Sequence, residues 1–165
     1  ECLVGSEMCI RDRATMLADG SAEIGMLPEP NVTSTLAGND NLRIALNLTE
    51  EWNKVCSTEL VQGVVIARKS FVNEHPEAIE QFLREYEKSS AFVNENIDEA
   101  AKLIVDVGIL GNVEIAKKAI PNCNISFSKG EAMHKAVEGM LTVLFEANPK
   151  SIGGKLPDKD FYYGI

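Results

Sequence analysis

Hydrophobic and polar residues alternate with two different periods along this chain, one typical of β-strands and one typical of α-helices. Between residues 42 and 48 every second residue is apolar, with Arg43 and Asn47 on the opposite face, which predicts a half-buried strand. The run of β-branched residues within 61–67 predicts a strand that is buried on both faces. A shorter apolar stretch, 23–27, predicts another strand, which must end at the prolines that follow it.

Helical periodicity accounts for most of the other segments. Pro76 begins the clearest predicted helix, which extends to about residue 94 because its apolar residues share one stripe. Ser128 and Glu131 have the spacing of a capping box and predict the start of a helix that ends before Pro149. Further helices are predicted at 14–19, 31–37, 97–107 and 112–119. Strands that alternate with helices predict an α/β protein with helical crossovers.

The composition and net charge of the chain limit the kinds of molecule with which it is expected to interact. The 165 residues are 45% hydrophobic and 25% charged, which is typical of a globular protein rather than a disordered one. The net charge of −9 is not interrupted by any cluster of Lys and Arg, so a nucleic-acid partner is disfavoured. No apolar run approaches the roughly 18 to 20 residues that cross a bilayer.

The opening residues, 1–13, resemble a translated sequencing adapter of the transposon type, and we expect them to be non-native. Without them the acidic balance persists, but two of the four cysteines are lost. Cys56 and Cys123 remain, too few for a disulfide scaffold or a zinc-ligand set. We expect two unpaired buried thiols, and a bridge in an oxidising compartment stays possible.

The sequence contains no catalytic or metal-binding pattern. His75 and His134 lie near no Cys or carboxylate pattern of a nucleophile or metal site, and both are predicted to be surface residues. The Gly-containing segments lack the Lys-Ser/Thr of a phosphate loop. We therefore predict no catalytic residue, no metal and no cofactor.

One concentrated polar feature stands where a predicted strand leads into a helix at Glu29, Pro30, Asn31 and Thr33. Backbone amides and the Thr33 hydroxyl could hold an anionic group there, while Glu29 could receive an amine or hydroxyl. An equally weighted interpretation is that Glu29 and Asn31 cap the helix.

The order of several segments resembles solute-binding proteins of the taurine, alkanesulfonate, nitrate and thiamine-precursor type, which serve ABC importers. The segments are Gly20–Pro30 (GSAEIGMLPEP), 76–83 (PEAIEQFL), 90–101, 119–124 (AIPNCN) and 151–163, which ends in Phe161-Tyr162-Tyr163. Glu23 stands where Asp is commoner in that family.

The resemblance implies a fold and a domain organisation. It implies part of a type 2 periplasmic-binding fold, an α/β fold with two lobes joined by a hinge, whose N-terminal part is missing. Residues 14–60 would end lobe 2 and cross the hinge, and residues 61–165 would complete lobe 1. Trp52 and Gln62, near the hinge, join the predicted ligand-binding residues.

The implied function is noncatalytic capture of a small solute and its delivery to ABC permease and ATPase subunits. The protein would be periplasmic or extracellular, anchored to the membrane only through a lipid on its missing N-terminus. Two alternatives on the same fold stay open. One is the effector-sensing domain of a transcription regulator, and the other is a cytoplasmic enzyme of thiamine-pyrimidine or menaquinone biosynthesis.

Overall fold

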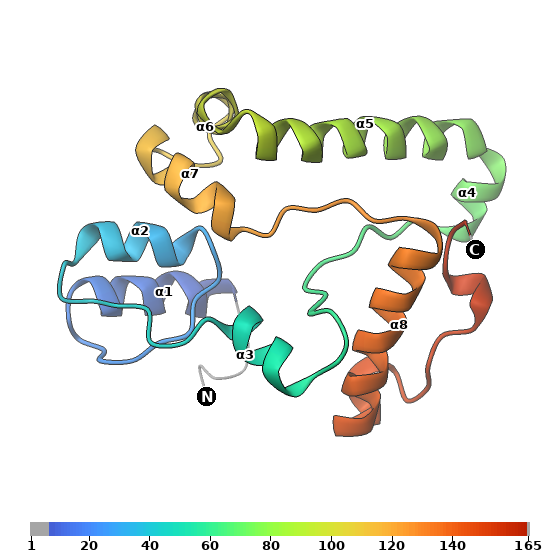
Figure 1. Ribbon diagram of the computed structural model, residues 1–165, viewed down its shortest axis with the longest axis horizontal. Helices are drawn as coiled ribbons and strands as arrows, with labels where there is room; N and C mark the ends of the chain where they lie inside the picture. Colours follow the sequence, from blue (N-terminus) through green and yellow to red (C-terminus); the bar gives the residue numbers. More distant parts are fainter. Residues whose placement is uncertain (1–6, 165) are drawn as a thin grey trace. The chain divides into compact units, whose positions relative to one another are not determined.

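The described chain consists of helices of unequal length joined by irregular segments (Figure 1). The computed structural model describes residues 7–164. Their helices are α1 Glu7–Ala18, α2 Asn31–Gly38, α3 Leu48–Val55, α4 Lys69–Glu74, α5 Pro76–Glu95, α6 Ile97–Asp106, α7 Val113–Ala119, η1 Ile120–Asn122, α8 Gly130–Ala147, η2 Pro149–Ile152 and η3 Lys159–Phe161, where η marks a 3₁₀-helix.

The helices fall into two compact units. Unit 1 comprises the described residues up to Ile44 together with Phe82–Ser126. Unit 2 comprises Ala45–Gln81 together with the described residues from Phe127 onward. Each unit is therefore assembled from two separate stretches of chain, and each is described by itself below.

The predicted α/β fold with two lobes around a hinge is wrong. No β-strand occurs anywhere in residues 7–164, which are helical or irregular. Apart from Leu48, which begins α3, the stretches predicted as strands are irregular coil, and most of their apolar residues are exposed, with Ile24 at 90%, Leu46 at 65% and Ile66 at 81%. A strand is stabilised by hydrogen bonds to a neighbouring strand, which the described residues do not provide, whereas helices close their hydrogen bonds locally.

The core of unit 1 lies between α6 and α7, where small side chains let the helix backbones approach closely. Its buried residues are Ala100, Ala101, Ala116 and Ile120. Half-buried side chains surround this cluster, namely Phe92, Val93, Ile97, Ile104, Leu110 and Val113. The cluster is small and rich in alanine, so a large share of the stability of unit 1 depends on its one large member, Ile120.

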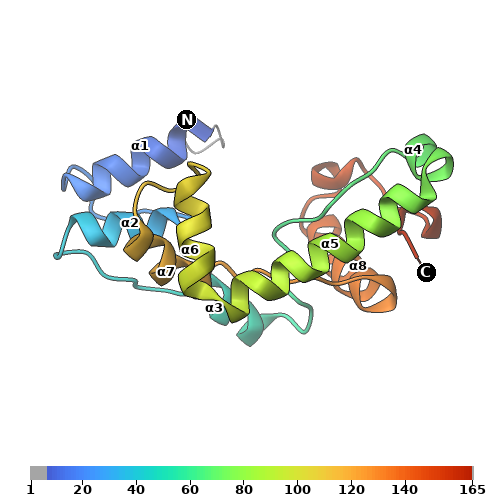
Figure 2. The same cartoon turned by 90° about the horizontal axis from the view of Figure 1, so that it is seen from above.

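Polar contacts also fix helices of unit 1, including α1 and the α6–α7 pair. The Asn39 amide donates to the carbonyls of Leu17 and Ala18, which satisfies the C-terminal end of α1. The Asn112 side chain caps α7 by accepting from two backbone N–H groups of its first turn. Lys117 of α7 pairs with Asp98 of α6 at 2.8 Å. Figure 2 shows α1 beside α2 and α6 beside α7.

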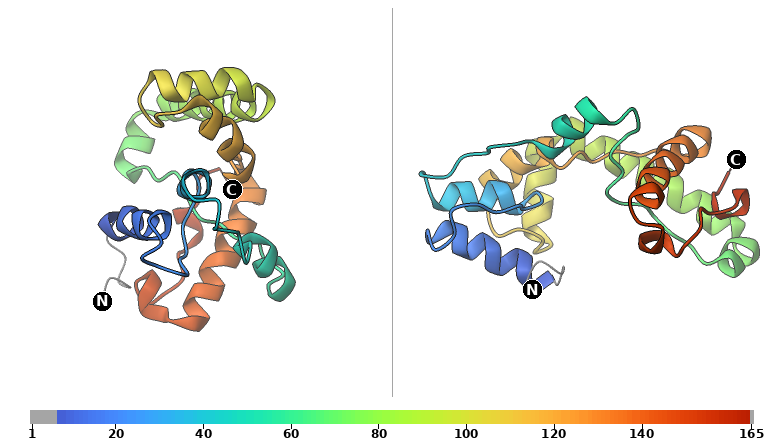
Figure 3. Two further views of the ribbon diagram at one scale, coloured as in Figure 1. Left: turned by 90° about the vertical axis from the view of Figure 1, so that its left-hand side faces the viewer. Right: turned by 90° about the horizontal axis from the view of Figure 1, so that it is seen from below.

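Unit 2 is organised around α8 and the C-terminal tail, which turns back toward this helix (Figure 3). Val137 of α8 and Tyr162 of the tail are buried. The Tyr162 ring meets the ring of His134 edge-on, at 4.4 Å between centroids. The Tyr163 hydroxyl donates to Glu80 at 2.7 Å, so the tail also contacts the first turns of α5.

Several predicted helices are confirmed and others are corrected. Helices α2, α5 and α6 lie close to their predicted ranges. The capping box at Ser128 is wrong, because α8 begins at Gly130 after Lys129 and no side chain caps it. Helix α1 begins at Glu7 rather than Ala14, so it runs through the boundary placed after residue 13. Residues 1–6 of the expected adapter-derived segment lie outside the described residues.

Helices α3 and α4 were not predicted, because no helical periodicity was identified at 48–55 or 69–74. Within residues 7–164, no helix combines the length and the apolarity needed to cross a membrane.

Candidate functional site

A pocket in unit 2 brings together two of the residues predicted to bind ligand, Trp52 and Gln62. Its volume is about 470 Å³. The lining residues come from α3 and from the irregular segment after it, and they are Leu48, Glu51, Trp52, Val55, Leu60 and Gln62. Four of the six are apolar or aromatic, the composition expected of a small-molecule site with a few orienting polar groups.

Helix α3 positions one wall of this pocket. The Asn47 side chain accepts from the N–H groups of Thr49 and Glu50 and so fixes the start of the helix. From that start, Leu48, Trp52 and Val55 follow at spacings of four and three residues, which places them on one face. The apolar wall is thus a direct product of helical periodicity.

A single hydrogen bond orients the aromatic ring of the pocket. The Trp52 Nε1–H donates to the carbonyl of Thr58 at 2.7 Å, across the turn that follows α3. This bond engages the only polar group of the indole and leaves the ring itself for stacking or apolar contact. The same turn returns the chain beside α3, so Leu60 and Gln62 complete the pocket.

Two polar groups of the pocket could orient a ligand. The Gln62 amide is on an exposed residue and can both donate and accept. One oxygen of Glu51 contacts the Lys54 ammonium at 2.7 Å, which offsets its charge at the pocket edge. The arrangement suits an apolar or aromatic small molecule with a hydrogen-bonding group.

At the start of α2, Glu29 acts as a helix cap. Its Oε2 accepts from the Thr33 N–H at 3.2 Å and its Oε1 accepts from the Thr33 hydroxyl at 3.1 Å. Capping by Glu29, one of the two interpretations left open, is therefore confirmed, while ligand binding at this junction stays a prediction. Asn31 is the first residue of α2, and Pro30 stands at the N-cap without a side-chain bond, so the predicted cap by Asn31 is wrong.

The capping carboxylate also changes the electrostatics of this junction. Glu29 supplies a negative charge where the helix dipole favours one, and the Thr33 hydroxyl is already donated to it. Burial and then the Glu29 charge raise the pKa of the Cys123 thiol. An anionic ligand would meet this carboxylate, so the junction is the weaker of the two predicted binding regions.

The predicted site residues thus form two sets. Glu29, Pro30, Asn31 and Thr33 are half-buried in unit 1, whereas Trp52 and Gln62 belong to unit 2. Sequence reasoning missed the other lining residues of the Trp52 pocket. The available signal was Asn47 followed by helically spaced Leu48 and Val55, but the alternation in 42–48 was interpreted as a strand.

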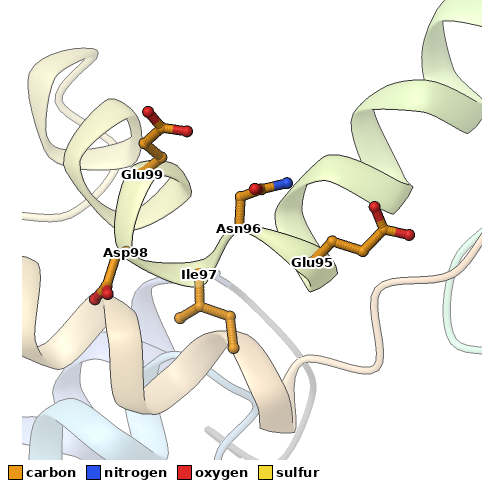
Figure 4. A pocket seen from close by; sticks show the side chains of 5 residues that line it. All are labelled: Glu95, Asn96, Ile97, Asp98 and Glu99. Carbon is orange, nitrogen blue, oxygen red and sulfur yellow. The ribbon is translucent and has the colours of Figure 1, made fainter.

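A second hollow lies at the junction of α5 and α6. It is lined by Glu95, Asn96, Ile97, Asp98 and Glu99. Figure 4 shows their carboxylates pointing in different directions rather than toward one point. One of them, that of Asp98, is held by Lys117. No group of three or more metal-ligating side chains occurs in the part of the chain that the structure describes.

The remaining reactive side chains, the histidines and cysteines, correct two predictions. His75 is exposed, as predicted, with its ring 4.9 Å from that of Phe71. His134 is not a surface residue, since only 17% of its side chain is exposed and Tyr162 packs on it. Cys56 and Cys123 are free, and both are half-buried rather than buried.

No protein family, no curated protein and no solved structure matches this chain.

Proposed function

We propose that this chain is part of a noncatalytic solute-binding protein that captures a small molecule outside the cytoplasmic membrane and delivers it to the permease and ATPase of an ABC importer. The observation that carries the proposal is the pocket around Trp52 and Gln62. The ordered sequence segments described above add support for the class of transport protein. The fold gives none, because residues 7–164 contain no sheet.

The pocket favours binding over catalysis. Its lining offers an oriented indole, aliphatic side chains, one amide and the Glu51 carboxylate paired with Lys54, and it contains no nucleophile beside a base. Gln62 would select ligands by hydrogen bonding, and Trp52 would supply most of the apolar contact. Micromolar affinity for such a ligand would correspond to a binding free energy of about −8 kcal/mol.

Trp52 provides a direct test, because it is the only tryptophan in the sequence. The full chain would be titrated with taurine, short alkanesulfonates, nitrate and aminopyrimidines while the indole fluorescence is recorded. We expect at least one solute to change the emission in a saturable manner. The same solute at a hundredfold excess over its Kd should stabilise the protein by about 2.7 kcal/mol in a thermal-shift experiment.

A matched pair of variants tests the site. Gln62→Leu removes the amide at nearly constant volume and should weaken binding by roughly five- to tenfold, because one hydrogen bond contributes about 1 kcal/mol. Gln81→Leu makes the same change at an exposed position of α5 outside the pocket and should leave the affinity unchanged. Saturable binding with equal affinity in both variants would refute the site, and absence of binding across the panel would refute the function.

A further inference from the structure

The segment between α3 and α4 exposes a row of β-branched side chains. Residues 61–67 run as irregular coil between these helices of unit 2 (Figure 1). The side chains of Val64, Val65 and Ile66 are exposed to 56%, 57% and 81%. Such residues fit a pleated surface and are costly to leave in water, so this segment lacks a cover.

The backbone of the same segment is also unpaired. Within residues 7–164, no hydrogen bond joins an N–H or C=O group of residues 61–67 to another residue. A stretch with free backbone groups and β-branched side chains is a template for the addition of a strand from another chain. A second peptide backbone would cover these side chains and pair these backbone groups at once, which an apolar surface alone would not do.

We propose that residues 61–67 pair with the same segment of a second copy of this chain, in antiparallel orientation about a two-fold axis at Val64. Charge complementarity indicates this partner and this direction. Glu59 precedes the segment and Lys69 follows it, five residues on either side of Val64. Antiparallel pairing about Val64 brings Glu59 of each copy toward Lys69 of the other, at the start of α4 just beyond the paired segment.

A parallel pairing of the two segments would lose the charge complementarity between Glu59 and Lys69. A parallel, in-register pair would place Glu59 against Glu59 and Lys69 against Lys69, which is destabilising. The two-fold arrangement uses the same patch on both copies, as symmetric dimers do. Glu59 is exposed, and the Lys69 side chain is 71% exposed in its pair with Asp160, so it stays accessible to a second carboxylate.

The register gives a sharp test by disulfide cross-linking. The full chain would carry Ser in place of its four cysteines and a single new cysteine, Val64→Cys. Directly opposed residues of an antiparallel pair have Cβ atoms about 5 Å apart, which a disulfide can span with small adjustment. Gln62→Cys is the matched control, because its own copy would lie about four residues away along the partner strand, or roughly 13 Å.

We expect the position-64 variant to form covalent dimers at least tenfold faster than the position-62 variant under mild oxidation. Equal rates at both positions would overturn the register, and a chain that stays monomeric by sedimentation at all concentrations would overturn the dimer. Charge reversal gives an independent readout in low salt. Glu59→Lys should weaken the association at least threefold, and adding Lys69→Glu should restore it. Failure of the double variant to restore association would contradict the antiparallel charge pairing.

Discussion

Ile120 should be the residue on which the stability of unit 1 depends most. It follows α7 directly, is 3% exposed, and packs with Ala100, Ala101 and Ala116. Because its neighbours in the buried cluster are alanines, they cannot extend into a space left by a truncated side chain. The Ile120→Ala change therefore tests whether the core lies between α6 and α7.

The loss of unfolding free energy expected for Ile120→Ala follows from the packing around this side chain. Truncation of a buried isoleucine to alanine costs about 2 to 5 kcal/mol, depending on how far the surroundings collapse. Half-buried Phe92 and Leu110 border the cluster and can relax inward, which places the expected cost at about 2 to 3 kcal/mol. In a unit of this size, such a loss lowers the Tm by roughly 10 to 20 °C.

Urea unfolding followed by far-UV circular dichroism measures the free energy of unfolding. Ile120→Val should cost about 1 kcal/mol, since it removes one methylene equivalent. Ile109→Ala is the control, because Ile109 is 69% exposed and its truncation should change the free energy by less than about 0.5 kcal/mol. Equal losses in Ile120→Ala and Ile109→Ala would refute the assignment of the core.

Three further predictions concern single groups. Glu29→Gln should accelerate alkylation of Cys123 by iodoacetamide, since it removes a charge that raises the pKa of the thiol; an unchanged rate would show that the carboxylate is remote. Tyr162→Phe should leave the Tm unchanged or raise it, because the buried hydroxyl has no hydrogen-bond partner among residues 7–164. A loss of stability above about 1 kcal/mol would reveal such a partner. Lys117 lowers the pKa of Asp98, so this ion pair stabilises the fold above the ordinary pKa of an aspartate and ceases to do so as the pH falls through the lowered pKa. Lys117→Met should raise the titration midpoint of Asp98 measured by NMR, and an unchanged midpoint would contradict the pairing.

Local signals in the sequence were sufficient to predict those helices whose start and amphipathic face depend only on nearby residues. Helix α5 begins at Pro76 and carries an amphipathic stripe, both of which can be read within about twenty residues. The strand predictions were wrong because a strand depends on a partner that local sequence signals do not identify. Whether 61–67 becomes a strand depends on a partner segment that periodicity cannot identify, and the described residues contain none.

The residues of the candidate site were likewise predicted in part and missed in part. Trp52 and Gln62 were expected to bind ligand because of the family resemblance, and they do line one pocket. Leu48 was assigned to a strand by the alternation before it, so its place beside Trp52 was missed. The cap at Asn47 carried the competing signal, because an Asn followed by acidic residues in the next turn is typical of a helix start.

The division of the chain into two interleaved units has a consequence for its synthesis. Unit 1 is completed only by residues up to Ser126, long after its first stretch ends at Ile44. At common translation rates the first stretch waits on the order of ten seconds for its partner to emerge from the ribosome. Helices α1 and α2 must spend that interval with their apolar faces open to solvent, which makes the nascent chain a natural client for a chaperone.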